Sequence, residues 1–314
     1  MTAVIDERQQ QLIEKINSLR KKKNAIILAH YYQRGEIQDI ADVVGDSLEL
    51  ARRAQETDAD IIVFAGVKFM AETAKILNPD KKVLHPNPES GCPMADMATV
   101  EGVLNLKKQH PDAIVVSYIN TNADVKTVSD VIVTSRNAVK VVKKLDAKKI
   151  IFVPDQFLGS YIAKQVPEKE FILWKGFCPP HFNLTPDQLL ALKEKYPDAK
   201  IAVHPECNTE TVKIADFVGS TSQIIEYATT CESKNVIIGT EVGLKHWLEK
   251  INPEKNYIFP VNADYCGTVH CCDMKKNTLD KIADVLENET NEIVLPEDII
   301  EKARKPLDLM LSIV

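Results

Sequence analysis

The sequence predicts an α/β fold of three αβα-sandwich domains with small parallel sheets, related to one another by an internal pseudo-threefold repeat. Three observations lead to this fold. One segment recurs three times at nearly constant spacing, each copy alternates apolar strands with helices, and a proline-containing break follows the helix in every copy. Strands that alternate with helices favour parallel sheets that carry helices on both faces.

The recurring segment begins at Ile62, Ile150 and Val236, and it reads each time as an apolar strand, a helix, a break and a second apolar strand. Offsets of 88 and 86 residues superpose the copies. The same offsets align the prolines of the breaks, which are Pro79, Pro167 and Pro253. Extended upstream, each repeat is expected to run strand, helix, strand, helix, strand. A further helix is expected at about 97–109, 185–196 and 275–288.

These repeats set the expected domain boundaries. The first domain is predicted to comprise residues 1–96 and 275–314, closed by helices at about 6–22 and 296–312. The second is predicted at 97–184 and the third at 185–274.

Composition excludes several classes of function. The chain has 39 basic and 45 acidic residues, and its densest basic run, residues 20–23, ends a polar helix, so we expect no nucleic-acid partner. Apolar runs are far shorter than the roughly 20 residues of a membrane span, so no membrane partner is expected. The acidic N-terminus does not resemble a signal peptide, which predicts a cytoplasmic location. The 11 glycines form neither GxGxxG nor a P-loop, so hydroxyls and helix N-termini must hold any phosphate.

Polar side chains recur where the first strand of each repeat ends. The offsets pair His30 with Tyr118 and His204, and they pair Tyr32 with Asn120 and Glu206. Ligands of open parallel sheets bind beyond the carboxyl ends of the strands, so the repeats predict a shared polar site, although unrelated loop residues are the simpler alternative. Hydroxyls at the next helix starts, which are either ordinary caps or anion ligands, are Ser47, Ser135 and Thr221.

Cysteines give a second threefold set. Cys92, Cys178 and Cys271 each follow the last strand of a repeat. The chain has no paired CxxC motifs, so a structural Cys₄ zinc site is poorly supported, and three thiolates instead favour a [4Fe-4S] cluster with one iron open as a Lewis acid. Buried, inert thiols are the alternative. Cys207 and Cys231 have no counterparts in the other repeats, whereas Cys266 and Cys272 flank Cys271, and spacing excludes neither as the ligand.

Ten motifs in order resemble one known family. They are AHYYQ, GDSLELAR, GCPMADM, YINTNADVK, TSRNA, FCPPH, HPEC, VGST, IGTE and MKKNTL. The match as a whole runs from about residue 26 to about residue 310. This set resembles quinolinate synthase. The resemblance implies three αβα domains and a transferase that condenses iminoaspartate with dihydroxyacetone phosphate to quinolinate, losing phosphate and two waters, in de novo NAD biosynthesis. It also implies an aspartate oxidase or dehydrogenase as the supplier of iminoaspartate.

The resemblance further implies a [4Fe-4S] cluster on three cysteines. Cys92 and Cys178 match its ligands directly, and Cys271 matches through its position three residues before Met274. The family usually has proline after the third ligand, where this chain has Cys272.

The family's active-site residues fall on the positions that the repeat offsets selected, and the resemblance adds His181 and Ser220. Catalytic roles are expected for Glu206, Tyr32, Tyr118 and His204. Glu206 and Tyr32 are the candidates for proton transfer, and Tyr118 and Asn120 for orienting intermediates. Phosphate binding is expected from Ser135, Ser220 and Thr221, and carboxylate binding from His30, Ser47 and His204.

Two other functions use the same residues. One is a metal-free aldolase or isomerase of sugar phosphates with structural cysteines. An anaerobic preparation that contains no iron and no sulfide would favour this function. The other is a cluster-binding sensor without turnover, against which the polar strand ends argue.

Overall fold

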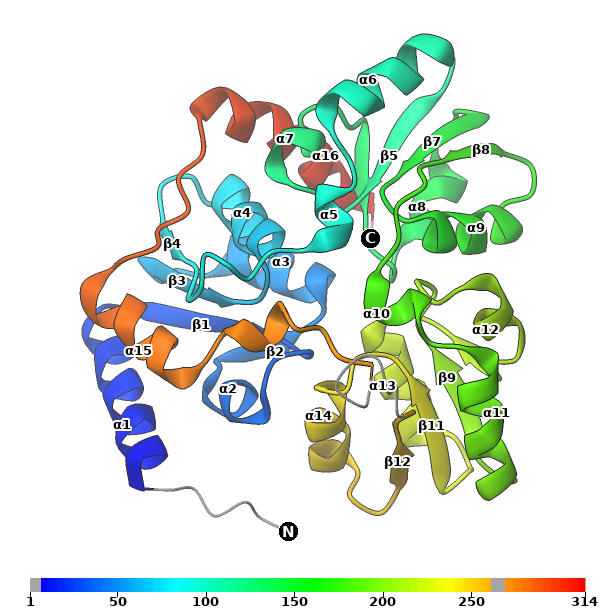
Figure 1. Ribbon diagram of the computed structural model, residues 1–314. Coiled ribbons are helices and arrows are strands. Elements are labelled where there is room, and N and C mark those ends of the chain that lie inside the picture. Colours follow the sequence, from blue (N-terminus) through cyan, green and yellow to red (C-terminus); the bar gives the residue numbers. More distant parts are fainter. Residues whose placement is uncertain (1–6, 261–268, 314) are drawn as a thin grey trace. The chain divides into compact units, whose positions relative to one another are not determined.

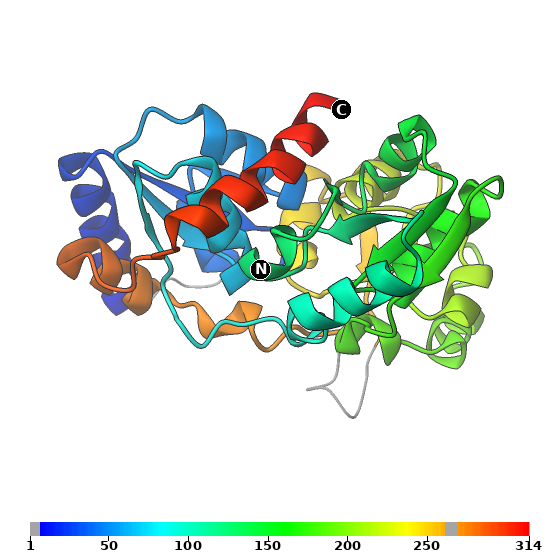
Figure 2. The same cartoon turned by 90° about the horizontal axis from the view of Figure 1, so that it is seen from above.

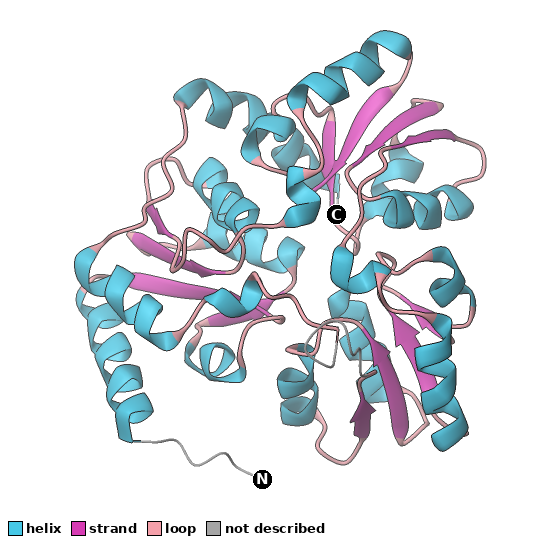
Figure 3. Cartoon of the chain, in the orientation of Figure 1, coloured by secondary structure: helices cyan, strands magenta, loops and turns pink. Residues whose placement is uncertain are grey.

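The computed structural model describes residues 7–260 and 269–313, and these residues contain three four-stranded parallel sheets with helices packed around them (Figures 1 and 3). The predicted α/β class with three small sheets is therefore confirmed. The chain divides into two compact units. Unit 1 comprises Met1–Gly91 and Cys272–Ile300, and unit 2 comprises Cys92–Cys271 and Glu301–Val314. No helix in the described ranges is long and apolar enough to cross a membrane.

Unit 1 contains the first sheet, whose strand order is β2-β1-β3-β4. Its strands are β1 (Ala25–His30), β2 (Val43–Gly45), β3 (Ile61–Ala65) and β4 (Lys82–Leu84). Its helices are α1 (Glu7–Lys22), α2 (Gly35–Ile40), α3 (Ser47–Glu56), α4 (Lys68–Leu77) and α15 (Leu279–Asn288), which the short 3₁₀ turn η1 (Met274–Lys276) precedes.

Helices α1 and α15 lie side by side on one face of this sheet (Figures 1 and 2). Ile16 of α1 and Ile282 of α15 pack with Ile27 and Val63 of the two central strands in one buried cluster. Successive strand residues face opposite sides, so Ile62 points to the other face, where α3 and α4 contact the strands. Burial of both faces explains why the central strands read as continuous apolar runs.

Unit 2 contains the second and third sheets, with the orders β6-β5-β7-β8 and β10-β9-β11-β12. The second sheet consists of β5 (Ile114–Tyr118), β6 (Val131–Val133), β7 (Lys149–Val153) and β8 (Glu170–Leu173). The third consists of β9 (Lys200–Val203), β10 (Phe217–Val218), β11 (Asn235–Gly239) and β12 (Asn256–Ile258).

Helices of unit 2 follow the same pattern. Those that precede or belong to the second sheet are α5 (Pro93–Asp96), α6 (Val100–Gln109), α7 (Ala123–Lys126), α8 (Ala138–Lys144) and α9 (Gln156–Gln165). Those of the third are α10 (Pro179–Phe182), α11 (Pro186–Lys195), α12 (Thr209–Lys213), α13 (Thr221–Thr230) and α14 (Leu244–Ile251).

The strand register repeats with the offsets that the sequence predicts. Central strand pairs that correspond under offsets of 88 and 86 residues are Ile26↔Ile62, Ile114↔Ile150 and Lys200↔Val236. The core repeats in the same way, because Ile27, Val115 and Ile201 are buried at equivalent places in their clusters. The internal repeat is therefore a repeat of backbone pairing and of packing.

Each sheet has four strands where the repeat predicted three. The additional strands, β2, β6 and β10, have only two or three residues, too few for a hydrophobic period to reveal. An aspartate that was also not predicted directly precedes each of these three strands. Asp42, for example, donates its N–H to Ile27 O (2.9 Å) and accepts the Ile27 N–H at its carboxylate (2.8 Å), and Asp130 and Asp216 repeat this clamp.

The predicted domain boundaries stay a prediction. Helix α16 (Glu297–Ile313) begins in unit 1, and its residues from Glu301 onward belong to unit 2, where Lys144 Nζ donates to Ile313 O (3.2 Å).

Strand order determines where each sheet can bind a ligand. The chain leaves the first central strand for one neighbour and then crosses to the other side, so the order reverses between β1 and β3, between β5 and β7, and between β9 and β11. Ligands of open α/β sheets bind beyond the carboxyl ends of the strands at such a switch point.

Candidate active site

Unit 2 brings two of these switch points together. Tyr118 is the last residue of β5, and Glu206 follows β9 by three residues. The Tyr118 hydroxyl donates to Glu206 Oε1 at 2.6 Å, although the two residues are 88 positions apart. The ends of the second and third sheets therefore share one polar site.

Glu206 is the centre of this site. Its second carboxylate oxygen, Oε2, lies 2.9 Å from His181 Nδ1, and its side chain is only 4% exposed. Burial opposes ionisation, but His204 and His181, together with hydrogen bonds from His181 and Tyr118, hold the pKa of Glu206 well below its usual value. The group is therefore a carboxylate held against a phenol and an imidazole.

His204 is fixed in one orientation by its own loop. Its Nδ1 accepts the N–H of Glu206 (3.3 Å), and its Nε2 lies 3.3 Å from the Ser135 hydroxyl. Its ring lies 4.9 Å from that of His181. His204 thus connects the third sheet to the hydroxyl loop that follows β6 in the second.

His181 joins the strand ends to a cysteine. Its Nδ1 lies 3.1 Å from Cys178 Sγ, and its Nε2 lies 2.8 Å from the Thr240 hydroxyl at the end of β11. The ligand atoms of Cys178, His181 and Glu206 all lie within 4.8 Å of one another, which makes them a group able to hold a metal ion.

The three predicted ligand thiols belong to unit 2 and interact electrostatically. Burial raises the pKa of the Cys178 thiol well above its ordinary value, and Glu206, Cys92 and Cys271 raise it further. Burial, Cys271 and Glu206 likewise raise the pKa of Cys92. Groups that disfavour one another's ionisation in this way become thiolates when a cation binds them, so the donor set fits a metal or metal cluster.

Local structure holds each of these thiols. Cys92 and Cys178 are the N-caps of α5 and α10, each followed by proline at the first helical position. Backbone N–H groups of Met94 and Ala95 favour the Cys92 thiolate, and that of His181 favours the Cys178 thiolate.

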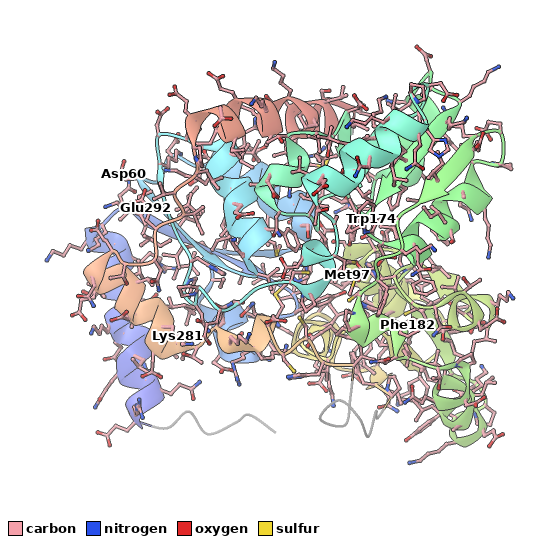
Figure 4. The ribbon with its side chains drawn as sticks, turned by 45° about the horizontal axis from the view of Figure 1, so that its top comes forward. Asp60, Met97, Trp174, Phe182, Lys281 and Glu292 are labelled. Atoms are coloured by element: carbon pink, nitrogen blue, oxygen red, sulfur yellow. The ribbon has the colours of Figure 1, made fainter. Side chains whose placement is uncertain are left out.

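The loops that carry Cys92 and Cys178 are linked to each other. Trp174 and Met97 lie near each other (Figure 4), and Trp174 Nε1 donates to Met97 O (2.9 Å). The N–H of Phe177 donates to Met97 Sδ (3.4 Å).

The third cysteine is tied to β11. Glu241, 1% exposed, accepts the Cys271 N–H at Oε1 (3.2 Å) and the Gly243 N–H at Oε2 (2.6 Å). Cys272, the alternative ligand, is exposed, and Cys266 lies outside the described residues.

The hydroxyl residues predicted to bind anions occupy three different local settings. Ser220 is the N-cap of α13 and accepts the N–H of Gln223 (3.4 Å), so Thr221, buried beside it, is the first helical residue. Ser135 does not start a helix, because Asn137 caps α8. Ser47 follows the cap Asp46, which accepts two N–H groups. The expectation that all three positions are helix starts is therefore wrong for Ser135.

In unit 1, His30 and Tyr32 repeat the arrangement of His204 and Glu206. His30 Nδ1 accepts the Tyr32 N–H (3.1 Å), and the two rings lie 4.5 Å apart. Lys275 donates to the carbonyl of Tyr32, and Arg34 Nε donates to Lys275 O (3.0 Å). The MKKNTL motif thus holds the loop after β1.

Sequence reasoning missed the polar residues that follow the third strand of the second and third sheets. Asp155 and Thr240-Glu241 stand there, buried at the switch points of the second and third sheets. Burial raises the pKa of Asp155 well above its usual value, and the nearby Glu206 adds to the rise. The repeat offsets pair Asp155 with Glu241, and that pairing was the signal available in the sequence.

Asn120 is the predicted site residue with an unused acceptor. Its amide oxygen is buried and has no hydrogen-bond partner among the described residues.

Parallel α/β sheets whose switch points carry a carboxylate, imidazoles, a phenol and a thiol define an α/β enzyme with a polar site that is able to hold a metal ion. The sequence profile of NadA, the quinolinate synthetase A protein family, matches residues 14–312. A quinolinate synthase of Sulfurihydrogenibium sp. (strain YO3AOP1) is 80% identical over 303 residues, which is 96% of this chain and 98% of the relative. That of Aquifex aeolicus (strain VF5) is 65% identical, covering 98% and 95%, and that of Clostridioides difficile (strain 630) is 49% identical, covering 94% and 96%. The chain belongs to the quinolinate synthase family, which acts in NAD biosynthesis.

Proposed function

We propose that this chain condenses iminoaspartate with dihydroxyacetone phosphate to quinolinate, releasing phosphate and water. The observation that carries the proposal is the buried set of Tyr118, His181, His204 and Glu206 at two adjoining switch points, in a chain of the quinolinate synthase family. Isomerisation of the triose and loss of water both require proton transfer. A carboxylate that contacts both a phenol and an imidazole can transfer protons directly to and from them.

We further propose that Cys92, Cys178 and Cys271 hold a [4Fe-4S] cluster. Supporting this assignment, the three thiols interact electrostatically, and two of them cap short helices whose N–H groups favour thiolates. When bound, a cluster with one iron free of protein ligands supplies a Lewis acid that polarises C–O bonds.

The chain's own residues then divide the remaining work. Glu206 takes or returns a proton through its contacts with Tyr118 and His181. Asn120 directs its unused amide oxygen at an N–H or O–H of an intermediate. His204 Nε2, which lies 3.3 Å from the Ser135 hydroxyl, donates to a carboxylate of the substrate.

Other assignments rest on the sequence. Ser135, Ser220 and Thr221 are proposed to bind the phosphate, with the N-terminus of α13 adding N–H groups. His30, Ser47 and Tyr32 of unit 1 are proposed to bind carboxylates and to exchange a proton. An aspartate oxidase or dehydrogenase is the proposed source of iminoaspartate.

Anaerobic purification tests this function directly. The wild-type chain is expected to contain about four iron and four sulfide per chain and to make quinolinate from dihydroxyacetone phosphate and enzymatically generated iminoaspartate. Cys92→Ser, Cys178→Ser and Cys271→Ser are expected to lose both properties.

Cys272→Ser is the matched control, because its thiol is exposed and adjoins Cys271. It is expected to keep cluster and activity. Loss of the cluster in Cys272→Ser with retention in Cys271→Ser would transfer the third ligand to Cys272. Activity without iron would instead support a metal-free aldolase, and a cluster without turnover would support a sensor.

A further inference from the structure

The contacts around Cys178 describe a second metal site that differs from a three-cysteine centre. Only one of its donors is a thiol. Cys178 Sγ, His181 Nδ1 and Glu206 Oε2 converge, with Nδ1 lying 3.1 Å from the sulfur and 2.9 Å from the carboxylate oxygen. A single proton can form a hydrogen bond between only two of these three atoms, whereas a metal cation can accept a lone pair from all three at once.

The two donors other than the thiol have outer partners that fit a metal ligand. His181 contacts the fully buried Thr240 hydroxyl through Nε2 (2.8 Å), which fixes the ring with Nδ1 toward the site. Glu206 Oε1 accepts the Tyr118 hydroxyl (2.6 Å), which leaves Oε2 for the site. Metal-binding histidines and carboxylates in proteins regularly have such partners.

The distances suit a tetrahedral ion. Zinc binds sulfur at about 2.3 Å and nitrogen or oxygen at about 2.0 to 2.2 Å, which separates neighbouring ligand atoms by about 3.3 to 3.6 Å. The two measured separations need to open by about half an ångström to reach this geometry. One thiolate, one imidazole and one carboxylate leave a fourth position for water.

We propose that, in chains without the cluster, Cys178, His181 and Glu206 bind one divalent transition-metal ion of the Zn²⁺ class. Because Cys178 is shared, the ion and the cluster exclude one another. Zinc then blocks cluster assembly and occupies Glu206 at the same time. The inference uses the cluster assignment of the proposed function only for this exclusion, and the binding of zinc itself does not depend on activity.

Zn²⁺ titration of the full-length, cluster-free chain tests the site, with a chromogenic chelator as the competitor. One equivalent is expected to bind. His181→Ala and Glu206→Gln are expected to weaken binding roughly 100-fold, and Thr240→Val about tenfold. Co²⁺ in place of Zn²⁺ is expected to give the spectrum of a tetrahedral site with a single thiolate.

Cys92→Ser and Cys271→Ser are the decisive controls, because they remove the proposed cluster ligands without touching this triad. Both are expected to bind Zn²⁺ as the wild type does. Weakened binding in either, or a Co²⁺ spectrum with three thiolates, overturns the proposal in favour of zinc on the three cysteines. If His181→Ala fails to fold by circular dichroism, Glu206→Gln, which preserves side-chain shape, decides instead, and unchanged binding in it overturns the proposal.

Exclusion is tested by cluster reconstitution. One equivalent of Zn²⁺ added first is expected to suppress the cluster absorbance of the wild type and to leave that of His181→Ala largely unaffected. Equal suppression in both contradicts the shared-ligand mechanism. If no cluster forms even without zinc, the proposed function fails, while the zinc titration still judges the site.

Discussion

The loops after β1 and β5 have backbone carbonyls at equivalent positions that different side chains satisfy. In unit 1 the Gln38 amide donates to Tyr31 O (3.0 Å) and Gln33 O (2.9 Å). In unit 2 the equivalent Lys126 donates to Ile119 O (2.9 Å) and to Thr121 O. Both side chains are buried, and Lys126 is completely so.

This difference shows which property the repeat preserves. The fold requires a donor at this position to satisfy two loop carbonyls, and an amide and an ammonium both provide one. The kind of donor is free to vary, so unit 2 has a buried lysine amine between Ile119 and Thr121. The residues that follow the strands vary in the same way, because the position of Tyr32 and Asn120 carries a carboxylate only in the third repeat, at Glu206.

The strongest test of this comparison removes the carboxylate. Glu206→Gln is expected to lower turnover roughly 100- to 10,000-fold, because the amide cannot accept a proton from Tyr118 or His181. The cluster absorbance should be retained. Steady-state quinolinate formation measures the loss, with Glu210→Gln, an exposed acid on the next helix, as the control. Full activity in Glu206→Gln would remove this residue from the mechanism.

Lys126 offers a test of the two loop clamps. Lys126→Met is expected to lower the free energy of unfolding by about 4 kcal/mol, because two buried carbonyls lose their donor. Lys126→Gln, which copies the first repeat, should recover most of this stability. Urea unfolding measures both.

Activity separates the charge of Lys126 from its hydrogen bonds. If Lys126→Gln folds normally but raises the KM for substrate, the cation contributes to anion binding. Equal stability of the methionine and glutamine variants would contradict the clamp.

A third test concerns His85, which stands where the second repeat has Leu173. Burial lowers the pKa of His85 from 6.5 to about 4, the adjacent Gly66 carbonyl partly offsets this, and Lys68 adds to the decrease. Between these two pH values His85 is therefore protonated in the unfolded chain but neutral in the folded chain. The contribution of His85 to the free energy of unfolding is fully present above pH 6.5 and is lost as the pH falls to about 4.

The expected loss is about 3 kcal/mol over that range. His85→Leu should flatten this part of the profile, which thermal unfolding across the pH range measures. An unchanged acid dependence in the leucine variant would place the sensitivity elsewhere.

The smallest expected effect belongs to a contact that all three repeats share. Lys81, Lys169 and Lys255 donate to the carbonyls of residues 57, 145 and 231 at equivalent places. Substitution of each by methionine should lower the free energy of unfolding by about 1 kcal/mol. Strongly unequal losses, measured by urea unfolding, would show that the repeats are alike in geometry but not in energy.

Much of the scaffold could be predicted because its signals are local. The helices predicted at about 97–109 and 185–196 appear as α6 and α11, and the central strands pair with the predicted offsets. The short strand β10 was missed because two residues carry no period. The cap of α8 was misplaced because Ser135 and Asn137 are both good capping residues, and only the backbone decides between them.

The site was predicted less completely. His181 entered through resemblance alone, and Thr240 and Glu241 entered only as part of the IGTE motif, without a role, although they contact His181 and Cys271. Their roles depend on which side chains lie next to them in the folded chain. Residues in the loops after strands show no hydrophobic periodicity from which such contacts could be predicted.

The sequence by itself determined the tripled alternation of strands and helices, their offsets and their buried faces, because burial imposes a period on each element separately. Only the tertiary structure decided that Tyr118 meets Glu206, that His181 lies between Glu206 and Cys178, and that Glu241 holds Cys271. Apart from the contact of His181 with Cys178, which lies within α10 and its N-cap, those contacts join residues 25 to 88 positions apart. Their distances are set by the packing of whole sheets, which no local pattern encodes.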